Sequence, residues 1–175
     1  YVIGEEEIRK NCRMYQDSIT EYYRGSGLVC YASKAFCCKE MCRIVKEEGM
    51  GIDVVSGGEL YTAMQVEVPP EKIQFHGNNK TDADIEFAIE NHIGYFVCDN
   101  LDELDAIDET AERHGIIQKI LLRLTPGIDP HTHVKISTGK VDSKFGIAIE
   151  TGQADEAIKA ALDKKNVKLC GYHCH

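Results

Sequence analysis

Residues 51–60 have the sequence GIDVVSGGEL, and the fold prediction begins with this stretch. Its first half, residues 51–55, is a short apolar run of the kind that forms a buried β-strand. Ser56 follows, with Glu59 three residues later, and this spacing is typical of a capping box at the start of a helix. The stretch therefore predicts a strand that leads directly into a helix.

The same unit of strand and helix recurs on both sides of this stretch. Further apolar segments predict strands at residues 28–32, 73–76, 95–98, 120–124 and 169–175. Apolar spacing and capping residues predict helices at residues 5–23 and 39–48, after Thr81, after Asn100 and at residues 153–163. This alternation implies a parallel sheet with right-handed crossovers. A (β/α)8 barrel and an open doubly wound sheet both fit, and the spacing alone does not choose between them.

One interval breaks the regular spacing of the strands. Residues 125–146, TPGIDPHTHVKISTGKVDSKFG, are polar and follow the carboxyl end of a strand, where α/β folds place their sites. We expect residues 126–146 to contribute to the mouth of an active site and to a dimer interface. The loop also carries a cationic cluster that could face an anionic cofactor or a carboxylate, formed by His131, His133, Lys135, Lys140 and Lys144.

Composition excludes several classes of partner. The net charge of −9 argues against nucleic acid or an anionic membrane surface, because both need clustered Lys and Arg. No apolar run approaches the roughly 20 residues that span a bilayer, and residues 1–11 lack the pattern of a secretory signal. The eight cysteines form no CxxC pair, which argues against a structural zinc site. Because no secretory signal is evident, we expect reduced thiols and a cytoplasmic location.

Chemically versatile side chains gather at the predicted strand ends. If the sheet closes, one mouth would collect an amine, an acid, a guanidinium and imidazoles: Lys34, Asp53, His76, Arg123, His173 and His175. Such a set suits an anionic cofactor bound through an amine, although a solvated loop lysine is the commoner state of a residue like Lys34. His173 and His175 share one strand face and could ligate a metal. We nevertheless expect no metal site, because no carboxylate or further histidine has an obvious matching position.

These residues lie in motifs that resemble one family of enzymes. The motifs YASKA (31–35), DVVSGGEL (53–60), HGNNK (76–80), LLRLTPG (121–127), THVKISTG (132–139), DSKFG (142–146) and GYHCH (171–175) resemble those of the diaminopimelate decarboxylases. These are fold-type III enzymes that use pyridoxal 5'-phosphate. The resemblance covers nearly the whole chain and implies an alanine racemase-like (β/α)8 TIM-type barrel. We expect residues 1–175 to form an incomplete barrel domain with about six of eight βα units, without the family's C-terminal β domain.

The resemblance also assigns roles to individual residues. Lys34 resembles the lysine that binds the cofactor as a Schiff base, and Asp53 resembles an acid near that lysine. Arg123 resembles a barrel arginine near the cofactor, and His175 resembles the histidine that stacks on its ring. With these we group His76 as a cofactor-binding residue. Lys144 resembles a lysine at the dimer contact, and we place His133 in the same loop.

The implied activity is the pyridoxal phosphate-dependent decarboxylation of meso-2,6-diaminopimelate to L-lysine by a homodimeric full-length enzyme. The 175 residues alone are expected to be weakly active or inactive. Two alternatives stay open. One is a related decarboxylase acting on ornithine, arginine or carboxynorspermidine. The other is a non-catalytic barrel protein that binds pyridoxal phosphate.

Overall fold

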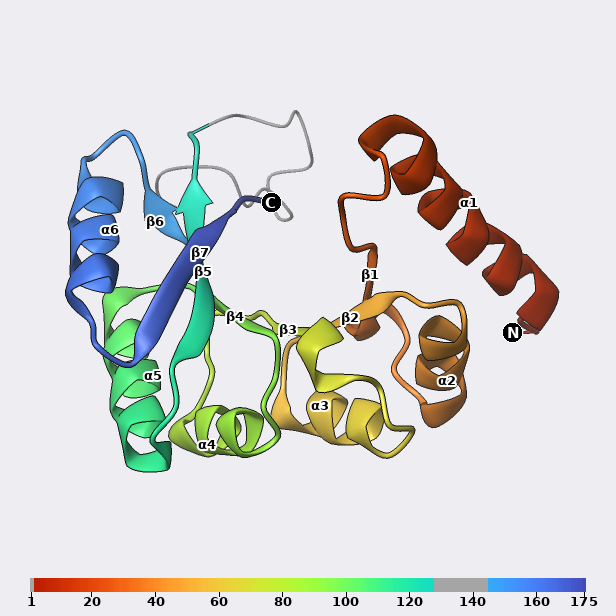
Figure 1. Cartoon of the computed structure of the whole chain (residues 1–175), viewed down its shortest axis with the longest axis horizontal. Helices are drawn as coiled ribbons and strands as arrows, with labels where there is room; N and C mark the ends of the chain where they lie inside the picture. Colours follow the sequence, from red (N-terminus) through yellow and green to blue (C-terminus); the bar gives the residue numbers. More distant parts are fainter. Residues whose placement is uncertain (1, 128–144) are drawn as a thin grey trace. The chain divides into compact units, whose positions relative to one another are not determined.

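A computed structural model describes residues 2–127 and 145–175 (Figure 1). The chain divides into two compact units. Unit 1 consists of Tyr1–Phe75 with His92–Gly94, and unit 2 consists of His76–Asn91 with Tyr95–His175.

Unit 1 contains three parallel strands in chain order. These are β1 (Cys30–Ala32), β2 (Gly51–Val54) and β3 (Ile73–Phe75). Its helices are α1 (Glu5–Tyr23), α2 (Lys39–Glu47) and α3 (Gly57–Met64), with short 3-10 turns η1 (Ser33–Ala35) and η2 (Pro70–Lys72). The side chain of Ser56 accepts a hydrogen bond from the Glu59 N–H, as expected of an N-cap, and α3 begins at the next residue.

The two faces of this small sheet differ in character. Strand β2 contacts both α2 and α3, and the apolar side chains of β2 and β3 are fully buried: Ile52, Val54, Ile73 and Phe75. Burying such a side chain contributes about 1.5–3 kcal/mol. Because side chains alternate along a strand, Cys30, Asp53 and Gln74 lie on the other face. Unit 1 therefore has an apolar face covered by helices and a second face that carries polar groups.

Helix α1 has the predicted bounds, but few of its side chains are buried. Cys12 is its one buried residue, whereas Tyr15 and Tyr22 are 58% and 73% exposed. Ionic contacts hold the helix to the end of α2 instead. Arg9 and Arg13 donate to Glu48 at 2.9 and 3.0 Å.

Unit 2 is built around one long parallel strand, β5 (Gln118–Thr125). Strands β4 (Tyr95–Cys98) and β7 (Val167–His173) both pair with it, and β6 (Ile147–Ala148) pairs with its last two residues. The helices are α4 (Asp82–Glu90), α5 (Leu101–His114) and α6 (Gln153–Asp163). Helices α5 and α6 lie side by side and contact β5 and β7 (Figure 1).

Local capping signals account for the helix ends of unit 2. Thr81 and Asp84 form a reciprocal capping box at the start of α4, and Asn100 accepts from the Glu103 N–H at the start of α5. Gly115 ends α5 in the left-handed conformation, at a φ of 64°, which glycine adopts without steric cost. The order of the elements confirms the predicted alternation of strands and helices, and the strand registers confirm the parallel pairing.

One prediction about the strands of unit 2 was wrong, and one strand was missed. Strand β7 ends at His173, so His175 lies beyond the strand in which we had placed it. Strand β6 was not predicted, because two residues carry no periodicity and pair only through a distant partner. No helix within the described residues combines the length and hydrophobicity that crossing a bilayer requires.

Candidate functional site

Lys34 lies on a turn that hydrogen bonds of its buried neighbour hold in place. It is exposed, in the middle of η1 directly after β1, while its neighbour Ser33 is fully buried. The Ser33 hydroxyl lies 2.7 Å from both the Asp53 carbonyl oxygen and Glu59 Oε2, so its proton is shared between β2 and α3. The Val55 N–H donates to the same Glu59 oxygen at 2.8 Å. The hydrogen bonds of Ser33 thus hold the backbone of the turn in place while the Lys34 amine remains exposed.

Asp53 lies next to this turn on the polar face of unit 1. It pairs in register with Ala32, two residues before Lys34. Burial and, next, the Asp53 carboxylate raise the pKa of the Cys30 thiol to about 12, so this thiol stays protonated at neutral pH. Gln74 Nε2 donates to Cys30 Sγ at 3.6 Å, which adds a third polar side chain to this face.

In unit 2, His76 meets a histidine of β7. The rings of His76 and His173 contact edge to face, with centroids 4.8 Å apart and an interplanar angle of 76°. Arg123 is the partner of His173 in the pairing of β5 with β7. The structure therefore brings together three of the predicted side chains: His76, Arg123 and His173. His175, by contrast, lies exposed two residues beyond the end of β7.

Asp99 holds Arg123 in place, and sequence reasoning missed it. It follows β4 and is 4% exposed. Its carboxylate accepts from Arg123 Nη1 at 3.3 Å and from the Gly146 N–H at 3.1 Å. The Arg123 guanidinium also stacks on Phe145, 4.6 Å from the ring centroid. The only available signal was an acid directly after a buried strand.

Gly146 can approach this cluster because it has no side chain. Its φ is +74°, and a Cβ there would lie 2.8 Å from Thr125 Oγ1 and 3.1 Å from the Arg123 carbonyl oxygen. The site therefore depends on glycine at this position. The predicted loop residues His131, His133, Lys135, Lys140 and Lys144 lie outside the described residues.

A buried ion pair that sequence reasoning also missed lies next to Asp99 in unit 2. The Lys80 side chain is fully buried, and its Nζ donates to Glu103 Oε1 at 2.8 Å. It also donates to the main-chain carbonyls of Gly77 at 2.7 Å and Val97 at 2.9 Å. All three ammonium protons are thereby used.

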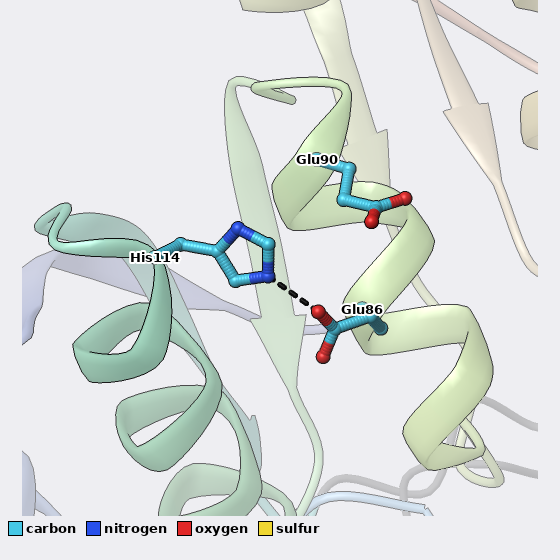
Figure 2. Close-up of side chains that lie close together, drawn as sticks. All are labelled: Glu86, Glu90 and His114. Atoms are coloured by element: carbon cyan, nitrogen blue, oxygen red, sulfur yellow. Dashed lines mark hydrogen bonds and ion pairs between the residues drawn. The ribbon is translucent and has the colours of Figure 1, made fainter.

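One group of potential metal ligands occurs among the described residues, on α4 and α5. Figure 2 shows His114 reaching from α5 toward Glu86, with Glu90 one turn away on α4. His114 Nε2 is hydrogen-bonded to Glu86, and Arg113 donates to the other Glu86 oxygen at 2.6 Å. Because a guanidinium already neutralises Glu86, the group is an ion-pair cluster that joins two helices. It does not involve His173 or His175.

Comparison with known proteins identifies the family. Residues 5–175 match the pyridoxal-binding domain of the pyridoxal-dependent decarboxylases. The diaminopimelate decarboxylases of Bacillus methanolicus and Staphylococcus aureus are each 46% identical to the chain, over 100% and 99% of it and 40% of each relative. The crystal structure of diaminopimelate decarboxylase from M. jannaschii in complex with L-lysine aligns with a TM-score of 0.90 at 40% identity. That alignment covers 99% of this chain and 41% of the other.

The chain thus spans about 40% of the length of these relatives. Their TIM-barrel fold favours the closed barrel over the open sheet, with about six of its strands in this chain. The matched family implies pyridoxal phosphate as the cofactor. The chain belongs to the pyridoxal-dependent decarboxylases, and residues 5–175 correspond to their pyridoxal-binding domain.

Proposed function

We propose that these residues form the cofactor-binding part of a diaminopimelate decarboxylase, which converts meso-2,6-diaminopimelate to L-lysine. The observation that carries the proposal is the exposed amine of Lys34, on an anchored turn at the carboxyl end of a parallel strand. Barrel enzymes place their chemistry at this end of their strands. The 46% identity to diaminopimelate decarboxylases supports this substrate.

The residues present fit pyridoxal phosphate, which needs an accessible amine for its aldehyde and polar or cationic groups for its ring and phosphate. Lys34 would hold the aldehyde carbon through its Nζ, and Asp53 would stand near it as an acid. Arg123, held by Asp99, would supply a fixed positive charge, while His76 and His175 would contribute imidazole contacts. When bound, the cofactor accepts the electron pair that remains as carbon dioxide departs.

The protein's own contribution is to bind and orient. The anchoring of Ser33 to Asp53 and Glu59 would keep Lys34 within reach of the cofactor without ordering a mobile loop at each turnover. The Asp99 contact would keep the Arg123 guanidinium from turning toward solvent. Both contacts come from buried or half-buried groups, so they hold these side chains in place before a ligand arrives.

Several features of the whole protein belong to the same proposal. We expect residues 1–175 to form an incomplete barrel domain of a cytoplasmic homodimer that acts on a small amino acid and binds neither nucleic acid nor membrane. All eight cysteines are free thiols, which supports a reducing compartment. His133 and Lys144 would lie at the dimer contact or the mouth of the active site.

Borohydride reduction tests the cofactor lysine. The protein is loaded with pyridoxal phosphate, reduced, digested and mapped by mass spectrometry. The label should lie on Lys34, and a label on Lys80 or Lys144 would refute the assignment. Carbon dioxide release is then measured with the full-length enzyme on meso-diaminopimelate and on ornithine, arginine and carboxynorspermidine. Turnover of one of the other three instead would reassign the substrate, and labelling of Lys34 without turnover would indicate a non-catalytic binding protein.

A further inference from the structure

The buried pair of Lys80 and Glu103 connects two segments of unit 2: residues 76–80, and the turn after β4 that contains Asp99. Lys80 ends the segment 76–80, and its hydrogen bond to the Gly77 carbonyl closes that segment on itself. Its hydrogen bond to the Val97 carbonyl fixes the segment to β4. Since His76 directly precedes Gly77, the ammonium group restrains the backbone that carries the imidazole.

Glu103 extends the connection to the turn after β4. While its Oε1 accepts from Lys80, its Oε2 lies 3.3 Å from the Asp99 N–H, which donates to it. The carboxylate of Asp99 in turn holds Arg123 and the Gly146 N–H. One buried pair therefore lies behind both His76 and Arg123, two of the candidate cofactor contacts of this unit.

The chemistry of the pair points to a supporting role. An ammonium with three acceptors has no free position for a ligand, and the side chain is fully buried. Burial raises the pKa of Glu103, while the neighbouring Lys80 lowers it. An apolar pair would fill the same space, but it would leave the Gly77 and Val97 carbonyls without these donors. Lys80 thus contributes hydrogen bonds to two main-chain groups, one in the segment 76–80 and one in β4, that an apolar residue could not make.

We infer that Lys80, paired with Glu103, is a positioning residue that sets His76 and Arg123 in the geometry that binds pyridoxal phosphate. The inference rests on the proposed function. The inference concerns the hydrogen bonds by which Lys80 positions the main chain, and not the charge of the pair. Two substitutions separate these two properties. Glu103→Gln removes the negative charge, yet Lys80 can still donate to both carbonyls and to the oxygen of the new amide. Lys80→Met removes both donors while keeping an unbranched side chain.

The experiment compares these two variants with matched changes at an exposed ion pair. Lys164 contacts Asp105 at 2.7 Å, with 27% and 60% of their side chains exposed, and Asp105 lies on the same helix as Glu103. Lys164→Met and Asp105→Asn are therefore the controls. A double variant, Lys80→Met with Glu103→Leu, avoids a lone buried charge and is the fallback if Lys80→Met does not fold. Circular dichroism confirms folding in each case.

Two readouts are used besides activity. Fluorescence titration gives the dissociation constant for pyridoxal phosphate, and the visible absorption band of the bound cofactor reports its surroundings. Lys80→Met and the double variant should weaken binding by about 10- to 100-fold, as when a group that orients a ligand-binding side chain is lost. They should also shift the band. Both controls should keep the wild-type affinity and band, and Glu103→Gln, which leaves the Lys80 hydrogen bonds to both carbonyls in place, should lose less affinity than Lys80→Met.

The outcomes separate this inference from the function on which it rests. If the wild-type protein binds no pyridoxal phosphate, the proposed function fails, and the inference fails with it. If the wild type binds and the folded double variant binds equally well with the same band, the function stands and the inference alone is overturned. A loss in Glu103→Gln equal to that in Lys80→Met would also overturn it, because charge and not position would then be the cause.

Discussion

Replacing Asp99 by Ala should destabilise unit 2 far more than its single carboxylate suggests. Asp99 is 4% exposed and Arg123 is 9% exposed, so the change leaves a buried guanidinium without this counter-charge. Removing one partner of a buried pair costs about 3–5 kcal/mol. The Gly146 N–H also loses an acceptor, which adds about 1 kcal/mol or more where water does not replace it.

The geometry places the loss from the ion pair near the low end of its range. The hydrogen bond from Arg123 measures 3.3 Å, which is long for a charged pair, and the cation also stacks on Phe145. We therefore expect a loss of about 4 kcal/mol in the free energy of unfolding, about 3 from the ion pair and about 1 from the Gly146 N–H. With a urea m-value of about 2 kcal/mol per molar, the midpoint should fall by about 2 M.

Urea unfolding followed by circular dichroism measures this shift without cofactor. Asp105→Ala is the control, because it makes the same chemical change at an exposed pair with Lys164, where the loss should be about 0–1 kcal/mol. Equal midpoints for the two variants would refute the reasoning, since Asp99 would then act as an ordinary surface carboxylate.

Two further predictions test packing and pH dependence. Gly94→Ala should lower the free energy of unfolding by at least about 3 kcal/mol, because the new Cβ would lie 2.3 Å from the Glu71 carbonyl oxygen. Gly58→Ala should instead raise the free energy of unfolding by about 0.5–1 kcal/mol, because the atom nearest to the new Cβ is 3.9 Å away. Denaturation midpoints equal to that of the wild type in both variants would contradict these two expectations. The hydrogen bonds from His114 and then Arg113 hold the pKa of Glu86 below its usual value of 4.5. Its contribution to stability should therefore be complete above pH 4.5 and disappear as the pH falls through the lower folded-state pKa. Glu86→Gln should lower the melting temperature at neutral pH but not in strong acid, and a deficit that persists in acid would contradict this.

Local chemistry explains which parts of the fold could be predicted from the sequence. Ser56, Thr81 and Asn100 each cap a helix through hydrogen bonds within three residues, so a short window of sequence contains the whole interaction. Gly115 ends a helix through its own backbone conformation. The observed bounds of α1, β4 and α6 agree with the predicted ones, because each element is a local segment with its own apolar pattern.

The rest depends on partners far apart in the chain. Strand β6 forms because Ile147 pairs with Leu124. Asp99 contributes to the site because it accepts a hydrogen bond from the Gly146 N–H, 47 residues further along the chain. Lys80 looks like any loop lysine until Glu103, 23 residues later, is seen to share its buried position. The residues that the structure adds to the candidate site are thus those whose partners no local pattern reveals.

The three hydrogen bonds of Lys80 also determine which amines can react. A lysine attacks an aldehyde only as a neutral amine with an accessible lone pair, and Lys80 is fully buried with each of its protons engaged. Lys34, by contrast, is exposed. The fold therefore makes Lys80, after the third strand, inert to carbonyl reagents and leaves Lys34, after the first strand, open to them. A small aldehyde would modify Lys34 much faster than Lys80.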